Sequence, residues 1–139
     1  MKGEEQVSNH IIGDKFQLTA FLGKGGFGNT YGAFDLSTNQ EVAIKITREG
    51  KSQTIIEHEA QVSSKLSGAI GFPKFVDFLH DNGDTIFAME FLGRSLSSIM
   101  EFLHHPLSLK SVYMVADQTL CRIQYLHQRN YSDNENYCL

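Results

Sequence analysis

Residues 23–45 read GKGGFGNTYGAFDLSTNQEVAIK, and this stretch decides the fold. Its first six residues, Gly23 to Gly28, fit the pattern G-x-G-x-x-G, which alone is a weak signal and also fits an ordinary flexible hairpin. A dinucleotide-binding loop needs a helix directly after the last glycine, but Asn29 to Phe34 looks like a strand, and the G-K-[ST] ending of a Walker-type loop is absent. The pattern therefore predicts a strand–glycine loop–strand hairpin, whose backbone N–H groups can approach phosphate oxygens because no side chain intervenes.

The strand that ends this stretch, Val42-Ala43-Ile44-Lys45, places a small residue and a cation on one face. Side chains alternate along a strand, so Ala43 and Lys45 point one way while Val42 and Ile44 point the other. We expect Ala43 to leave room for a flat base, and Lys45 to lie further along the same face, where phosphates carry the charge. A lone lysine is more often a solvent-facing residue on a half-buried strand, so a partner is needed to decide between the two interpretations.

A predicted helix over residues 52–67 contains that partner. At about 100° per residue, one stripe of this helix is formed by Ile55, Glu59, Val62 and Leu66. Glu57 lies on the opposite side and is interpreted as a surface acid. Burying a carboxylate is unfavourable unless it is paired. We therefore expect Glu59 to pair with Lys45; the alternative is a glutamate at the helix edge that reaches water.

The remaining patterns predict an α+β chain with an antiparallel sheet. The predicted strands are 15–22, 30–34, 41–47, 75–79 and 85–92, and the predicted helices are 52–67, 96–103 and one from the N-cap Ser108 to about Asn130. Short turns such as Asn82-Gly83, a strong hairpin signal, connect neighbouring strands and imply antiparallel pairing. We expect a flexible leader over 1–14, a strand-rich region with the nucleotide site over 15–92, and a helical region over 93–139.

Composition narrows the classes of function. The 139 residues are 41% hydrophobic and 20% charged, which suits one globular domain, and the net charge of −4 offers no basic field for nucleic acid or acidic lipid. The six histidines lack the spacing of metal ligands. The two cysteines support no disulfide framework. The polar N-terminus lacks the apolar core of a secretory signal. No apolar run approaches the ~20 residues that span a bilayer. We expect a cytoplasmic or nuclear protein with no metal site and with neither nucleic acid nor membrane as a partner.

In combination, these residues resemble the protein kinase family, and more narrowly its casein kinase I group. The resemblance runs from about Ile12 to Tyr131, and several ordered motifs at compatible spacing make it specific. The motifs are Leu22 to Gly28, Val42 to Lys45, Glu59, Gly71-Phe72-Pro73, Met89 to Gly93, and the helix from Ser108 to His127. The resemblance implies a protein kinase-like α+β fold with a five-stranded antiparallel small lobe, one regulatory helix, and an incomplete helical large lobe.

The resemblance also implies which residues would contact the phosphates of ATP. Lys45 would hold the α- and β-phosphates, and Glu59 would orient Lys45. The glycine loop would cover the phosphates, with Phe27 as the cap at its tip. The residues implied at this end of the site are Gly23, Lys24, Gly25, Gly26, Phe27, Gly28, Thr30 and Lys45.

The adenine end of the implied site has a different composition. By resemblance, Leu22, Ala43 and Met89 would bound the adenine pocket, with Met89 as the gatekeeper. Backbone groups of Glu90 and Leu92 would hydrogen-bond the edge of the base.

The sequence departs from the family pattern in several places. Thr30 stands where the glycine-loop motif usually has valine, and Arg94 stands where the casein kinase I group usually has proline. The family motifs His-Arg-Asp and Asp-Phe-Gly do not occur in the 139 residues, so the ligands of the Mg²⁺ that the family uses are absent, and we expect this chain alone to be inactive. Residues 135–139 look like the segment that follows the lysine-proline within a casein kinase I catalytic loop, with Asn136 at the metal-binding asparagine, but a chance polar tail fits equally.

Two functions follow from the resemblance. The first is the ATP-binding part of a serine/threonine protein kinase, which transfers the γ-phosphate of ATP to protein serine or threonine when complete. The alternative is a non-catalytic module that binds nucleotide or docks to a kinase. One face of the helix after Ser108 is apolar, and it consists of Val112, Val115, Ala116, Thr119, Leu120, Ile123 and Leu126. Without the rest of the large lobe this face would be exposed, which implies a protein substrate or partner that covers it.

Overall fold

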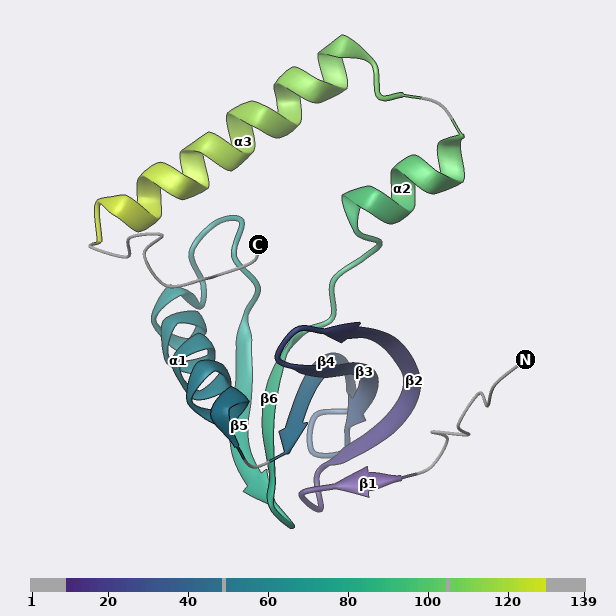
Figure 1. The fold of residues 1–139 in the computed structure, drawn as a ribbon, viewed down its shortest axis with the longest axis vertical. Coiled ribbons are helices and arrows are strands. Elements are labelled where there is room, and N and C mark those ends of the chain that lie inside the picture. Colours follow the sequence, from purple (N-terminus) through teal and green to yellow (C-terminus); the bar gives the residue numbers. More distant parts are fainter. Residues whose placement is uncertain (1–9, 49, 105, 130–139) are drawn as a thin grey trace. The chain divides into compact units, whose positions relative to one another are not determined.

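The computed structural model describes residues 10–48, 50–104 and 106–129. The chain divides into two compact units, Met1–Leu92 and Gly93–Leu139. Within the described residues, the first unit contains a six-stranded sheet and one helix, and the second contains two helices (Figure 1).

The sheet is antiparallel throughout, as predicted. Its strands are β1 Ile11–Ile12, β2 Phe16–Gly25, β3 Gly28–Asp35, β4 Gln40–Arg48, β5 Phe75–Asp81 and β6 Asp84–Glu90, arranged in the order β1-β2-β3-β4-β6-β5. The Asn82-Gly83 turn between β5 and β6 has φ values of 50° and 84°. Positive φ at both central residues is the conformation for which Asn-Gly is favoured, so the hairpin prediction is confirmed.

The predicted leader over 1–14 is wrong at Ile11 and Ile12. These residues form β1, which pairs with Gln17 and Phe16 of β2, and Ile12 is buried in the core. The sheet therefore has six strands, one more than expected. A strand of two residues is too short to show period-two patterning, so the sequence carried no signal for it.

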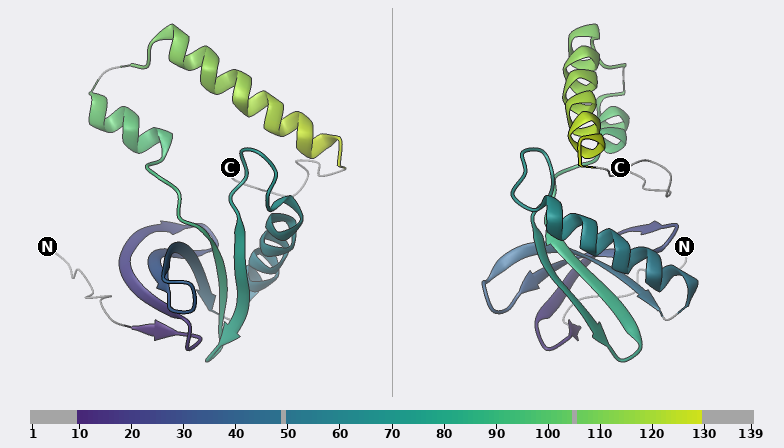
Figure 2. Two further views of the ribbon diagram at one scale, coloured as in Figure 1. Left: turned by 180° about the vertical axis from the view of Figure 1, so that it is seen from behind. Right: turned by 90° about the vertical axis from the view of Figure 1, so that its left-hand side faces the viewer.

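The sheet curls until its two edges meet (Figure 2). Lys15, in the turn between β1 and β2, places its Nζ 2.5 Å from Oδ2 of Asp77 on β5 and 3.8 Å from Oδ2 of Asp35. The backbone N–H of Gly13 also donates to Asp81, at 3.0 Å. The concave face encloses the larger apolar cluster of buried residues, which consists of Ile12, Phe16, Leu18, Ala33, Val42, Ile44, Ile86 and Ala88.

The pKa values of Lys15 and Asp35 are both shifted in this arrangement. The hydrogen bond to Asp77 raises the pKa of Lys15, and this outweighs the lowering by burial. Burial alone would raise the pKa of Asp35, but hydrogen bonds from the hydroxyl and backbone N–H of Ser37, together with the charge of Lys15, lower that pKa below its ordinary value of 3.8. The lowered pKa means that the ionised carboxylate of Asp35 stabilises the folded unit.

Replacement of Asp35 by alanine is expected to lower the free energy of unfolding at pH 7 by about 1–3 kcal/mol, because the donors of Ser37 lose their buried acceptor. The pKa of Asp35 is lower in the folded state, so its contribution is present above about pH 3.8 and is lost as the pH falls toward the folded value. Urea unfolding at pH 7 and pH 3 measures both effects. Glu41→Ala, at an exposed acid on β4, is the control and should change stability by less than about 0.5 kcal/mol.

One helix, α1 Lys51–Leu66, packs on the sheet and has Ser67 as its C-cap, close to the predicted bounds. Its buried residues are Ile56, Ala60 and Leu66. Ile55 and Val62, which the predicted stripe contained, are only partly buried. Leu66 of the predicted stripe is buried, but around the middle of the helix the buried face is turned by about one residue, from Ile55 and Glu59 to Ile56 and Ala60.

The second unit contains α2 Leu96–Leu103 and α3 Leu109–His127. Ser95 and Ser108 cap them by accepting hydrogen bonds from Ser98 and Ser111, and the capping role of Ser108 was predicted. Neither helix buries a residue, and the large apolar side chains exposed on α3 are Leu109, Val112, Tyr113, Met114, Val115 and Leu120. In the described part of the chain, no helix has the length and apolar character needed to cross a bilayer.

Candidate functional site

The predicted ion pair between strand and helix is present. Nζ of Lys45 on β4 lies 2.6 Å from Oε2 of Glu59 on α1, and the two side chains are 16% and 30% exposed. A charge-assisted hydrogen bond of this length, partly shielded from water, is stronger than a pair of surface charges. The pair therefore fixes the lysine ammonium at a defined place between the sheet and the helix.

Strand register brings four predicted site residues to the face that carries Lys45. Directly opposed residues of antiparallel strands point to the same side. Thr30 of β3 is opposite Lys45, and Ala43 is opposite Met89 of β6. Val42 and Ile44 belong to the cluster on the concave face, as the alternation predicted. The face with Thr30, Ala43, Lys45 and Met89 is thus separate from the main core.

The glycine motif forms a tighter hairpin than expected. β2 continues through Gly25 and β3 begins at Gly28, so Gly26 and Phe27 alone make the turn, and the predicted turn over Gly23–Gly28 is wrong in its extent. A Cβ added at Gly26 would meet no heavy atom within 4 Å, whereas one at Gly28 would lie 2.6 Å from the carbonyl oxygen of Ile46. Gly28 is required by close packing of β3 on β4, and Gly26 leaves space at the tip.

This contrast leads to a prediction about two substitutions in one hairpin. Gly28→Ala is expected to destabilise the first unit by about 1–3 kcal/mol, because its Cβ forces apart two paired strands. Gly26→Ala should have an effect of less than about 0.5 kcal/mol. Urea midpoints of the two variants provide the measurement, and equal midpoints would contradict the packing described here.

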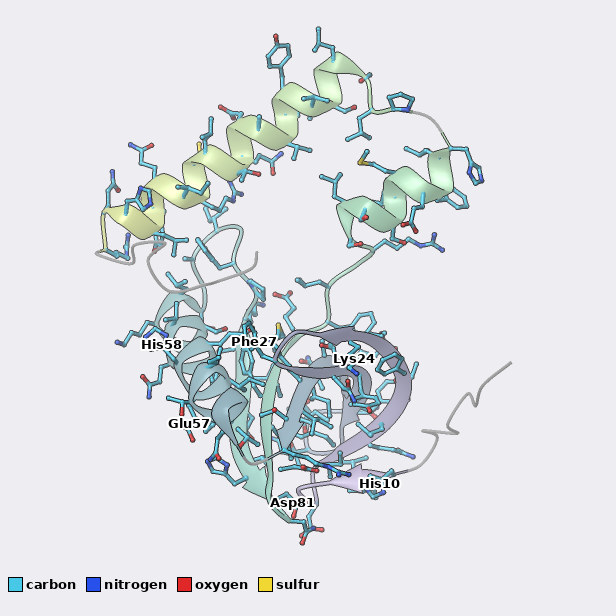
Figure 3. All side chains as sticks on the ribbon, viewed as in Figure 1. His10, Lys24, Phe27, Glu57, His58 and Asp81 are labelled. Atoms are coloured by element: carbon cyan, nitrogen blue, oxygen red, sulfur yellow. The ribbon has the colours of Figure 1, made fainter. Side chains whose placement is uncertain are left out.

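Phe27 makes a contact that the sequence did not predict. Its side chain is partly buried and packs against a second apolar cluster, formed by Ile56 and Ala60 of α1 and Phe87 of β6. Figure 3 shows Phe27 beside α1, whereas Lys24 of the same hairpin lies over the strands. The tip of the glycine hairpin is therefore attached to the helix that carries Glu59.

At the adenine end, the structure restricts which backbone groups could contact a base. The backbone N–H of Glu90 donates to the carbonyl oxygen of Lys74 at 2.9 Å, and the N–H of Lys74 donates to Oε2 of Glu90 at 3.1 Å. A contact from the Glu90 backbone to a base would therefore use its carbonyl. Leu22 and Leu92 are about half exposed, and their place beside Ala43 stays a prediction.

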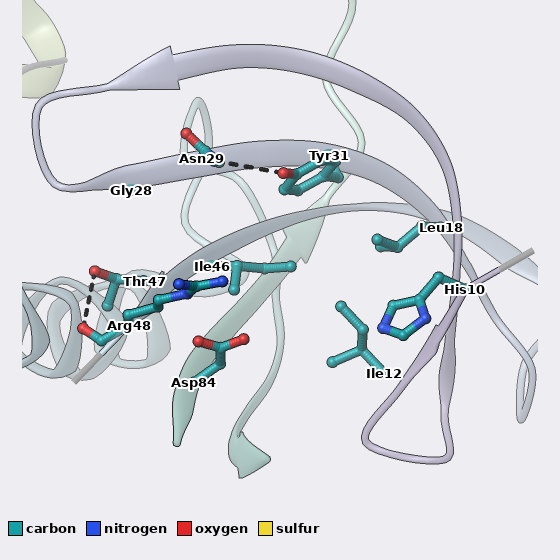
Figure 4. Close-up of a pocket in the computed structure, with 10 residues that line it drawn as sticks. All are labelled: His10, Ile12, Leu18, Gly28, Asn29, Tyr31, Ile46, Thr47, Arg48 and Asp84. Carbon is teal, nitrogen blue, oxygen red and sulfur yellow. Dashed lines mark hydrogen bonds between the residues drawn. The ribbon is translucent and has the colours of Figure 1, made fainter. Parts of the chain in front are cut away.

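A separate hollow lies elsewhere on the first unit (Figure 4). It is lined by His10, Ile12, Leu18, Gly28, Asn29, Tyr31, Ile46, Thr47, Arg48 and Asp84. Ile12 and Leu18 come from the core cluster of the concave face, and Gly28 is the one predicted site residue in this lining. The hollow is therefore distinct from the face of Lys45.

Three residues of the second cluster support the site and were not singled out from the sequence. Phe87 is the cross-strand partner of Lys45, and Ala60 follows Glu59 directly. The spacing of Ile56 and Ala60, four residues apart, was a usable signal, because such residues lie on one helical face. No set of three His, Cys, Asp or Glu side chains that could hold a metal occurs among the residues that the structure describes.

Comparison with known families identifies the class of protein. The protein kinase domain model matches residues 16–132 of this chain. The chain belongs to the protein kinase family. The glycine hairpin, the Lys45–Glu59 pair and the helix α1 all fall within the matched segment.

Proposed function

We propose that this chain is the ATP-binding part of a serine/threonine protein kinase of the casein kinase I type. The observation that carries the proposal is the 2.6 Å pair of Lys45 with Glu59 beside the glycine hairpin, in a chain of the protein kinase family. Protein kinases use a strand lysine held by a helix glutamate to bind the α- and β-phosphates of ATP.

The residues present fit a nucleoside triphosphate. Lys45 supplies a fixed positive charge, and the turn at Gly26 leaves its surroundings open, so phosphate oxygens would reach backbone N–H groups there. Ala43 and Met89 lie opposite each other on the same face and offer a small and a flexible apolar surface for the base. ATP would supply the transferred γ-phosphate; the residues of this chain would bind and orient the nucleotide.

The Mg²⁺ that accompanies ATP in protein kinases would need ligands from other segments of the family fold. Protein kinases bind Mg²⁺ together with ATP, through residues of the His-Arg-Asp and Asp-Phe-Gly segments. The 139 residues contain neither motif, and no candidate metal cluster occurs in the described parts of the chain. We infer that nucleotide binding depends on Lys45 and the hairpin.

The finer assignment to the casein kinase I type rests on sequence motifs. Gly71-Phe72-Pro73 and the helix from Ser108 to His127 resemble that group, and its members transfer phosphate to serine and threonine. The partner surface that we propose is the exposed apolar face of α3, on which Val112 and Leu120 are 46% and 65% exposed.

Titration of the chain with ATP, followed by the change in thermal midpoint, tests the proposal. A ligand that binds only the folded state stabilises it by about 2.7 kcal/mol at 100 times its dissociation constant. We expect ATP to raise the midpoint and inorganic phosphate at equal concentration to leave it unchanged. Absence of any shift with ATP would refute the proposal, whereas detectable, Lys45-dependent phosphate transfer to protein would exclude the non-catalytic nucleotide-binding alternative.

A further inference from the structure

Phe27, at the tip of the glycine hairpin, packs against helix α1. It is one of two residues in the turn, and its side chain is partly buried against the cluster of Ile56, Ala60 and Phe87. A turn residue at an open hairpin tip is ordinarily exposed. An aromatic residue packed inward at this position therefore joins the tip of the hairpin to α1.

The cluster that receives Phe27 flanks both members of the ion pair. Ala60 follows Glu59 on α1, and Phe87 is the cross-strand partner of Lys45. A shift of α1 that separates Glu59 from Lys45 would also pull Ala60 and Ile56 away from the cluster. The position of the hairpin tip and the formation of the ion pair are thus linked through one set of apolar contacts.

We propose that Phe27 is a positioning residue that couples the glycine hairpin to α1, so that nucleotide binding at the hairpin stabilises the Lys45–Glu59 pair. Any such coupling is reciprocal: if an ordered hairpin stabilises α1, an ordered α1 favours the hairpin conformation that binds nucleotide. The nucleotide part of this inference rests on the proposed function. The packing part, in which Phe27 holds α1, does not.

Hydrogen exchange of the α1 amides, measured with and without ATP, tests both parts. In the absence of nucleotide, Phe27→Ala is expected to speed exchange across α1 by about tenfold, the effect of roughly 1.4 kcal/mol of lost packing. Phe27→Leu should restore most of the protection because leucine keeps an apolar side chain there. With ATP, exchange in α1 should slow in the wild type, and this slowing should be absent in Phe27→Ala at saturating nucleotide.

Phe21→Ala is the matched control. Phe21 lies on β2 of the same hairpin, is 52% exposed, and packs edge-to-face on Tyr31 with ring centroids 5.4 Å apart. Its removal should leave exchange in α1 unchanged, with or without ATP.

Two outcomes would overturn the inference. Unchanged α1 exchange in Phe27→Ala without nucleotide would show that the packing does not hold the helix. Equal slowing by ATP in Phe27→Ala and in the wild type would show that the hairpin and helix are not coupled through Phe27. If ATP binds to neither protein, the proposed function fails, while the nucleotide-free comparison still decides the packing part.

Discussion

Replacement of Lys45 by methionine is expected to weaken ATP binding by about 10- to 150-fold. Hydrogen bonds to charged groups contribute about 1.5–3 kcal/mol, and each 1.4 kcal/mol is a factor of ten in the dissociation constant. Methionine keeps an unbranched apolar stem on β4 and removes only the ammonium group that pairs with Glu59. Titration with a fluorescent ATP analogue, displaced by ATP, measures the change.

Two control variants distinguish a specific contact of Lys45 with phosphate from a general effect of positive charge on ATP affinity. Lys65→Met removes an exposed lysine in the last turn of α1 and should leave the affinity unchanged. Glu59→Gln keeps the ammonium of Lys45 but removes the carboxylate that holds it, so we expect a smaller loss, of about tenfold or less. The role assigned to Lys45 would be refuted if Lys45→Met bound ATP as tightly as the wild type while its thermal midpoint was unchanged.

The local chemistry of this site could be predicted because short-range rules determine it. Alternation along β4 separated Lys45 and Ala43 from Val42 and Ile44, and the structure places Val42 and Ile44 in the core cluster while Lys45 faces α1. The pairing of Lys45 with Glu59 followed from the cost of an unpaired carboxylate in an apolar stripe. The first inference needed only the neighbours of Lys45 along the strand. The second needed only the requirement of one carboxylate for a partner of opposite charge.

Contacts between distant segments could not be predicted in this way. Lys15 and Asp77 are 62 residues apart, and they meet because the sheet curls, which no local pattern records. The four-residue spacing of Ile56 and Ala60 predicts a shared helical face, but whether that face or the one with Ile55 and Val62 is buried depends on how α1 is rotated on the sheet. The inward position of Phe27 depends both on the curl of the sheet and on the rotation of α1, because Phe27 contacts a cluster to which the sheet and the helix both contribute.

Replacement of Phe87 by alanine is expected to cause a large loss of stability in the first unit. Phe87 is 1% exposed, packs with Ile56 and Ala60 of α1, and stacks on Phe75 of β5 with ring centroids 6.1 Å apart. Truncation of a buried phenylalanine costs about 3–5 kcal/mol, against a total stability of about 5–15 kcal/mol for a typical domain. For a unit of this size, that cost lowers the thermal midpoint by more than about 12 °C.

Phe87 differs from Phe16 in its place opposite Lys45 on the neighbouring strand. Phe16 is equally buried, but it belongs to the cluster on the concave face and not to the cluster of Ile56, Ala60 and Phe87. Phe87→Ala should therefore speed hydrogen exchange more in α1 than in the strands of the sheet. Phe16→Ala should speed exchange in α1 and in the strands equally. Phe34→Ala, at a position that is 36% exposed, is the surface control and should shift the midpoint little. A midpoint for Phe87→Ala within a few degrees of that of Phe34→Ala would contradict the close packing of α1 on β6.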